Sequence, residues 1–350
     1  MKTFKFCFVA LAATVLFYAC SNEEAIRPIN DEAQAISFRL QGGTPEITTR
    51  ATATTAPYVD AFVVYGTDNV AGATKIFHDE TVARQVSGNF DYTPKKYYSI
   101  GAASAGFFAY SPVSATVNIS SISTTNPLSA TVTAAYTVIA PNTVNPGNTV
   151  QEDFLVAGTT VASPFTAPVS LDFQHALSRI FVKATNSLNE TVVITGLKLL
   201  RLNSAGTITG TPGTPAAAPG TPYTWSWGGY SSMIDYEYIL ARTGVAVPKS
   251  TTPTLVTSME QGMMVLPQST TGDLNTNGTW DANEFALEVT YDVGNLTAQT
   301  IRVFSATPIV FAMNSQYAIT IAFGSAGGPI AIEFSITVSP FDNDPLLTMP

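Results

Sequence analysis

One polar stretch, residues 273–284, has the residue types and the spacing of a calcium-binding loop. Such a loop places oxygen ligands at its first, third, fifth, seventh and twelfth positions, with a glycine at the sixth for a sharp turn. Suitable residues fill all of these positions: Asp273, Asn275, Asn277, Gly278, Thr279 and Glu284. The stretch is therefore a candidate Ca²⁺ site. The alternative is a polar hairpin loop without an ion, because Asp and Asn also favour turns.

Groups that could act as a catalytic base or nucleophile are few. The sequence has two histidines, His78 and His175, and nothing in the pattern brings them together as a metal site. His78 begins a His-Asp-Glu run that is typical of a solvated turn, and His175 lies at a strand kink, where a structural role is favoured. No Gly-x-Ser-x-Gly motif is present. We therefore expect that the protein is not an enzyme.

Aromatic residues gather near a glycine-rich turn in the stretch 203–230. They are Tyr223, Trp225, Trp227 and Tyr230. Rings of this kind can stack on a sugar, but they more often pack in a core or anchor a loop. The sequence favours the second interpretation and leaves the first open.

The first residues have the pattern of a secretion signal rather than of a folded element. Two lysines precede a short apolar run, and the segment ends on Ala19-Cys20. A small residue directly before a cysteine at this place resembles the processing site of bacterial lipoproteins. The resemblance implies a signal peptide over residues 1–19, a diacylglycerol and acyl lipid such as palmitate on the Cys20 sulfur, and a tether over 20–34. An ordinary signal peptide with an incidental cysteine is the alternative.

Short runs of alternating apolar residues, separated by turn-forming residues, recur along the rest of the chain. Only 12% of the residues are charged, and Thr, Ala, Ser, Val and Gly are frequent, which favours strands over helices. The first strand is expected at 35–41. The most regular one covers 330–338, and its apolar face consists of Ile330, Ile332, Phe334, Ile336 and Val338. We predict an all-β fold with two antiparallel β-sandwich domains of Greek-key, transthyretin-like topology, over residues 35–166 and 167–350.

Two neighbouring segments of the second domain have different patterns. Residues 191–202 are mostly apolar and predict a central strand, whereas 203–222 repeat Gly-Thr-Pro and predict a long loop or hairpin tip. The net charge of −9 argues against nucleic acid as a partner, which requires clustered Lys and Arg. After the N-terminal segment no apolar window reaches the length of about 20 residues that a transmembrane helix needs.

Several phrases of the sequence are similar to those of one family. They are Leu-Asp-Phe-Gln-His-Ala-Leu-Ser-Arg-Ile at 171–180, Phe-Phe-Ala-Tyr-Ser-Pro at 107–112, Met-Met-Val-Leu-Pro-Gln at 263–268 and Thr-Arg-Ala at 49–51. In this combination the chain resembles the fimbrillin family, the subunits of type V pili. The resemblance implies a structural or adhesive subunit that assembles with copies of itself or with other pilus subunits. It also implies a cell-surface fimbrium held at the outer membrane by the lipid anchor.

The resemblance also implies a route of assembly. In fimbrillins an arginine-specific protease cuts at the position that matches the bond between Arg50 and Ala51. Removal of residues 35–50 would open a groove whose unpaired backbone groups accept another extended strand, and 330–338 is the best donor. The alternative is a monomeric surface lipoprotein that binds a glycan or a host protein through the 203–230 stretch.

Overall fold

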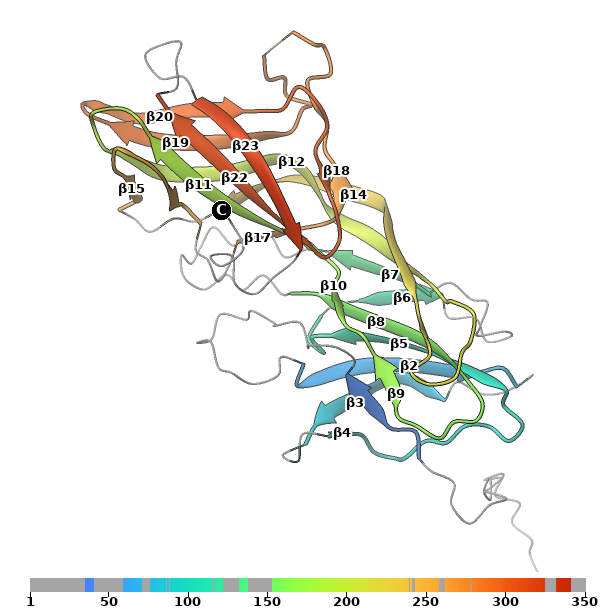
Figure 1. The fold of residues 1–350 in the computed structure, drawn as a ribbon. Helices are drawn as coiled ribbons and strands as arrows, with labels where there is room; N and C mark the ends of the chain where they lie inside the picture. Colours follow the sequence, from blue (N-terminus) through green and yellow to red (C-terminus); the bar gives the residue numbers. More distant parts are fainter. Residues whose placement is uncertain are drawn as a thin grey trace, which may run out of the picture. The chain divides into compact units, whose positions relative to one another are not determined.

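The computed structural model describes residues 35–40, 59–70, 76–85, 87, 89–115, 117–121, 132–137, 153–238, 240, 243–257, 262–277, 279–324 and 332–340. Every element in these residues is a β-strand (Figure 1), so the predicted all-β fold is confirmed. None of the described segments forms a helix that is long and apolar enough to cross a membrane.

The first large sheet, which we call the N-terminal sheet, has the strand order β10-β8-β5-β2-β3-β4, and β13 also pairs with β8. Its strands are β2 (Ala61–Asp68), β3 (Phe77–Arg84), β4 (Phe90–Asp91), β5 (Ser104–Ser111), β8 (Leu155–Ala162), β10 (Gln174–His175) and β13 (Thr221–Pro222). Strands β2, β5 and β8 are buried along nearly their whole length, so both faces of this sheet are covered. On one face a core forms with the short pair β1 (Phe38–Leu40) and β9 (Val169–Leu171).

Two more large sheets pack around the second core, which also includes residues of β2, β5 and β8 on the other face of the N-terminal sheet. The long sheet has the order β20-β19-β12-β7-β6, with β14 and β15 also pairing β12, and the C-terminal sheet has the order β16-β11-β22-β23, with β17 pairing β11. The strands of the long sheet are β6 (Asn118–Ser121), β7 (Val132–Thr137), β12 (Val192–Thr211), β14 (Thr224–Tyr238), β15 (Val245–Val247), β19 (Ala286–Val293) and β20 (Leu296–Val303). Those of the C-terminal sheet are β11 (Ser178–Asn186), β16 (Ser250–Leu255), β17 (Met263–Val265), β22 (Ser315–Phe323) and β23 (Ile332–Pro340). A separate pair consists of β18 (Gln268–Ser269) and β21 (Val310–Phe311).

Strand β12 is 20 residues long and continues well past the predicted strand end at Leu202. The predicted loop is therefore wrong for residues 203–211, which pair with β14 to form the β12–β14 hairpin, with its tip at 212–223. Buried and partly exposed positions still alternate there, but the buried positions hold small residues such as Ser204 and Gly210. A Cβ atom on Gly210 would lie 2.4 Å from the Trp225 ring. The two strands thus lie so close together that small residues are required at these buried positions. Small residues do not give the alternating apolar pattern by which a strand is predicted.

Most strand pairs are antiparallel, as predicted, but β1 with β9 and β11 with β22 are parallel. Pairing also links the two predicted domains, because β7 pairs with β12 and β13 pairs with β8. The Greek-key, transthyretin-like topology and the domain division between residues 166 and 167 stay predictions.

Candidate functional site: the first strand and its groove

Strand β1 is short and pairs only with β9 among the described strands. The register is Phe38 opposite Val169, and the Val169 N–H donates to the carbonyl of Ser37 over 2.8 Å. Ahead of the strand, the Ile36 N–H donates to the carbonyl of Lys96 over 3.0 Å. Among the described residues, the backbone of β1 and of the residues before it bonds to β9 and to Lys96, so its attachment also depends on its side chains.

The Phe38 side chain fills a pocket made of aromatic rings, and only 5% of the residue is exposed. Its ring centroid lies 5.4 to 6.0 Å from four others, all at steep interplanar angles: those of Phe62, Phe77, Tyr92 and Phe107. Edge-to-face pairs of this kind contribute about 0.5–1.5 kcal/mol each beyond their burial. The four rings come from β2, β3, β5 and the residue directly after β4. Phe38 is thus the main anchor of β1.

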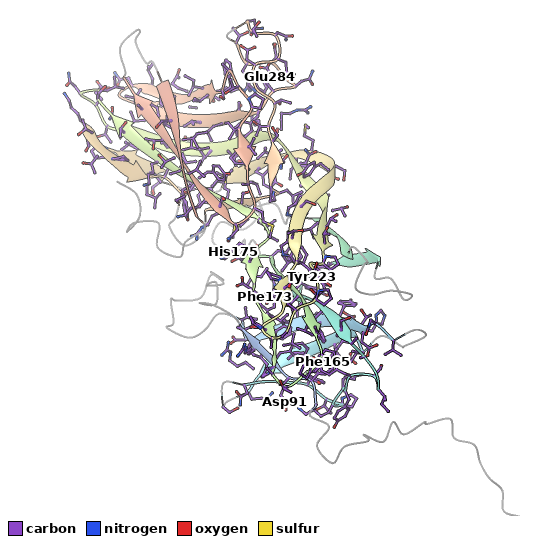
Figure 2. The ribbon with its side chains drawn as sticks, turned by 45° about the vertical axis from the view of Figure 1, so that its right-hand side comes forward. Asp91, Phe165, Phe173, His175, Tyr223 and Glu284 are labelled. Carbon is purple, nitrogen blue, oxygen red and sulfur yellow. The ribbon has the colours of Figure 1, made fainter. Side chains whose placement is uncertain are left out.

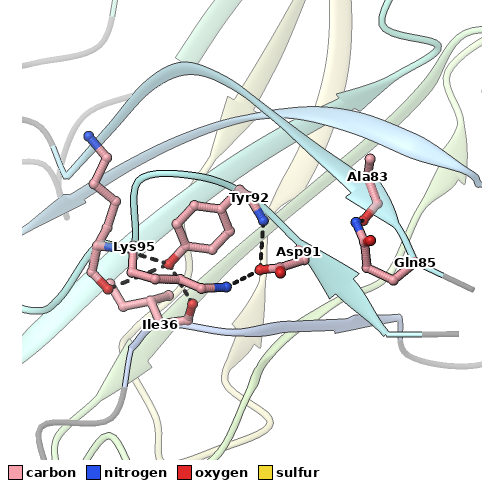
Figure 3. A network of polar contacts seen from close by, with 7 residues as sticks. Ile36, Ala83, Gln85, Asp91, Tyr92 and Lys95 are labelled. Atoms are coloured by element: carbon pink, nitrogen blue, oxygen red, sulfur yellow. Dashed lines mark hydrogen bonds and ion pairs between the residues drawn. The ribbon is translucent and has the colours of Figure 1, made fainter. Parts of the chain in front are cut away.

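The Tyr92 hydroxyl bridges the start of β1 to the neighbouring segment (Figure 3). It donates to the Ile36 carbonyl over 2.6 Å and accepts from the Lys96 N–H over 3.3 Å. Burial raises the pKa of Tyr92, so the phenol keeps its proton. Beside it, Lys95 contacts the Asp91 carboxylate, and this contact lowers the pKa of Asp91. Sequence reasoning did not single out these groups.

Strand β23 is the predicted donor, and it lies at the edge of the C-terminal sheet with β22 as its only partner among the described strands. It covers Ile332–Pro340, so four of the five predicted residues belong to it: Ile332, Phe334, Ile336 and Val338. Val338 is 56% exposed, whereas Ile336 packs partly buried against the second core. Ile330 lies outside the described residues, as do Cys20, Arg50 and Ala51.

The 273–284 loop is organised around Glu284, which is fully buried. Its carboxylate accepts from the backbone N–H of Leu274 over 2.7 Å and from that of Asp281 over 2.9 Å. The Asp273 carboxylate accepts from the Asn277 N–H over 3.2 Å.

The remaining predicted ligands also bond within the loop. The Asn277 amide oxygen accepts from the Thr279 N–H over 2.8 Å, and the Asn275 amide donates to the carboxylate of Asp281 over 2.7 Å. Among the described residues no group of three or more His, Cys, Asp or Glu side chains could hold a metal. The loop thus brings the predicted residues together, and calcium binding stays a prediction.

The two histidines have different partners. His175, labelled in Figure 2, is buried. Its Nδ1 lies 2.9 and 2.8 Å from the two carboxylate oxygens of the buried Asp153. His78 is exposed and lies with its ring edge-on to Tyr65, at a centroid distance of 5.6 Å. The aromatic residues of the hairpin act as anchors: Trp227 donates to the Ala176 carbonyl over 2.8 Å, and the Tyr230 hydroxyl donates to that of Pro267 over 2.5 Å.

These features define an all-β protein in which a short first strand packs among aromatic side chains and a longer strand lies at a sheet edge. A family model described as fimbrillin-like matches residues 49–340, and the chain belongs to this family. Family membership makes it a fimbrial or adhesion subunit of the cell surface rather than an enzyme.

Several solved structures are similar to this chain at low sequence identity. A fimbrial protein from Bacteroides vulgatus is 16% identical with a TM-score of 0.51, covering 81% of this chain and 92% of its own. A candidate cell adhesion protein from Bacteroides uniformis is 18% identical, with a TM-score of 0.47 and coverage of 88% and 99%. Another from Bacteroides ovatus is 15% identical, with a TM-score of 0.48 and coverage of 88% and 99%. No curated protein matches the chain.

Proposed function

We propose that this chain is a fimbrial subunit that polymerises by strand exchange. Cleavage after Arg50 by an arginine-specific protease releases β1, and β23 of a second copy takes its place in the groove. Before cleavage the subunit is a lipoprotein, held at the outer membrane by the lipid on Cys20. The observation that carries the proposal is that β1, with the residues before it, and the edge strand β23 have the same order of apolar side chains.

The match lies in the order of the side chains. β1 and the residue positions before it read Ile36-Ser37-Phe38-Arg39-Leu40, and β23 begins Ile332-Glu333-Phe334-Ser335-Ile336. Both have an aliphatic residue two positions before and two positions after a phenylalanine. Alternation in an extended strand directs these three side chains to the same face. A strand with this order suits a pocket that consists of four aromatic rings.

Cleavage supplies the direction of the exchange. In the intact chain β1 is linked covalently to β2, so it rebinds the groove at a high effective concentration. After cleavage β1 belongs to a separate peptide, and this advantage disappears. A donor of nine residues then replaces a strand of three. The exposed Val338 can become buried at the same time, and each such side chain contributes about 1.5–3 kcal/mol when fully buried.

The test compares three full-length variants by the ladder of polymers in material sheared from cells. Arg50→Ala should accumulate uncleaved monomer, and Phe334→Ala should lose most polymers. Thr337→Ala, on an exposed position of the same strand, is the matched control and should polymerise normally. The melting temperature of each monomer shows whether the body stays folded. Wild-type ladders in Arg50→Ala and Phe334→Ala would refute strand exchange, and monomer alone in the unmodified protein would favour the monomeric lipoprotein.

A further inference from the structure

The tip of the β12–β14 hairpin reaches the N-terminal sheet and pairs with β8 (Figure 1). Strand β13, within the tip, runs antiparallel to β8 with Thr221 opposite Thr160. Ala216 forms a parallel bridge to Val161, and its carbonyl accepts from the Ala162 N–H over 2.8 Å. The tip therefore serves as an added strand of a sheet to which the rest of the hairpin does not belong.

This pairing covers the outer edge of β8 along most of its length. β10 pairs with the first residues of β8, Leu155 and Val156. The tip bonds to residues 158–162, beginning with the Gly158 carbonyl, which accepts from the Tyr223 N–H over 2.9 Å. Without the tip, β8 would have unpaired backbone groups at a sheet edge. Such groups cost free energy when they are buried without a partner. When water reaches them, they can pair with a strand of another chain.

Side chains of the hairpin also cover the second face of the N-terminal sheet. Tyr223 is 6% exposed, and its ring centroid lies 5.9 Å from that of Trp225. Trp225 lies at 5.9 Å from Phe108 of β5. A Cβ atom on Gly158 would lie 2.5 Å from the Tyr223 ring, so the ring can lie against β8 only because residue 158 is glycine.

We propose that the hairpin tip is a structural tie on which the N-terminal sheet depends. It completes the edge of β8 and closes the face opposite β1, so that the sheet keeps a covered face whether or not β1 is in its groove. When the tip detaches, the N-terminal sheet loses its protection while the C-terminal sheet keeps its own. The tie belongs to the monomer and does not depend on cleavage or assembly.

Hydrogen exchange of the full-length monomer, followed by mass spectrometry, tests this tie. Tyr223→Ala removes the buried ring, and Gly228→Ala is the matched control, since a Cβ atom there has no neighbour within 4 Å. In Tyr223→Ala, amides of β5 should exchange roughly 100-fold faster, as expected for loss of a buried aromatic side chain. Amides of β22 should exchange as in the unmodified protein. Acceleration confined to the tip, or equal acceleration in β5 and β22, would overturn the proposal.

A second variant keeps the proposal falsifiable if Tyr223→Ala does not fold. Gly158→Ala places a Cβ atom against the same ring from the side of β8 and should also accelerate exchange in β5. Residues in direct contact show non-additive effects. Unchanged exchange in β5 of Gly158→Ala would overturn the proposal without any measurement on Tyr223→Ala. Where Tyr223→Ala does fold, the clash is absent from the double variant Gly158→Ala with Tyr223→Ala, so the added methyl group should cost almost nothing. Simple addition of the two effects would show that the contact between tip and β8 does not hold the sheet.

Discussion

Truncation of one side chain, Phe38→Ala, should loosen the first strand without a cut in the chain. The ring is almost fully buried and has four aromatic neighbours at centroid distances of 5.4 to 6.0 Å. Among the described strands, β9 alone pairs with β1 in addition to this anchor. The pocket left behind consists of large rings from four separate places in the sheet, which cannot collapse far without disturbing one another.

The magnitude follows from the burial of the ring. A buried Phe→Ala substitution costs about 3–5 kcal/mol, and a pocket that cannot collapse lies toward the upper part of that range. Every 1.4 kcal/mol or so changes an equilibrium constant about tenfold. The fraction of molecules with β1 out of the groove should therefore rise by roughly 100-fold or more. Because Phe38 is the main anchor of β1, most of the loss should appear in β1 itself.

Hydrogen exchange at residues 36–40 measures the release of β1 directly. Arg39→Ala, an exposed residue on the same strand, is the matched control and should leave exchange unchanged. If Phe38→Ala exchanged like Arg39→Ala, the ring would not anchor β1, and the reasoning from the aromatic pocket would be refuted. Exchange that rose equally in β22 would show that the substitution unfolds the whole molecule instead.

Other perturbations test the remaining parts of the account. Cys20→Ala should abolish metabolic labelling with palmitate, because no thiol remains to carry the lipid; labelling that persists would contradict this. If the 273–284 loop binds Ca²⁺, the ion should raise the melting temperature with an affinity in the weak range of about 10⁻⁴ to 10⁻³ M. Asn275→Ala should reduce this shift, whereas no effect of EDTA on the unmodified protein would reject the site. Burial raises the pKa of Tyr92, so its contribution to stability is complete below the ordinary tyrosine value of about 10 and declines as the pH rises above it. Tyr92→Phe should therefore melt earlier at neutral pH, yet lose less stability than the unmodified protein in alkaline melts.

The sequence could predict strands whose apolar residues alternate, because one buried face leaves a period of two. Strand β22 is such a case, with Tyr317, Ile319, Ile321 and Phe323 all buried. The second half of β12 could not be predicted in this way. Three of its four buried positions, Ser204, Gly206 and Gly210, hold small residues, and at Gly210 the facing Trp225 ring leaves no room for a larger side chain. The sequence also could not show which pairs depart from the predicted antiparallel arrangement, because alternation is the same for parallel and antiparallel pairs.

The site was only partly predictable for a similar reason. The first strand could be located from its own alternation, but the pocket of Phe38 brings together rings that are distant in sequence. No local pattern marks Phe62 and Phe107 as neighbours of the same side chain. The spacing of the calcium loop could be recognised in the sequence. Glu284, however, is fully buried, and its carboxylate accepts hydrogen bonds from backbone N–H groups of its own loop. The spacing of residues in the sequence shows which side chains of the loop can come together. It does not show which hydrogen bonds those side chains form.

A cryo-electron microscopy map of polymers purified from the cell surface would test the central claim most directly. The account predicts that the groove beside β9 holds β23 of the neighbouring copy, with Phe334 between Phe62 and Phe107 and no density for residues 36–40 of the acceptor. A polymer in which Phe38 still occupies that pocket would contradict assembly by strand exchange.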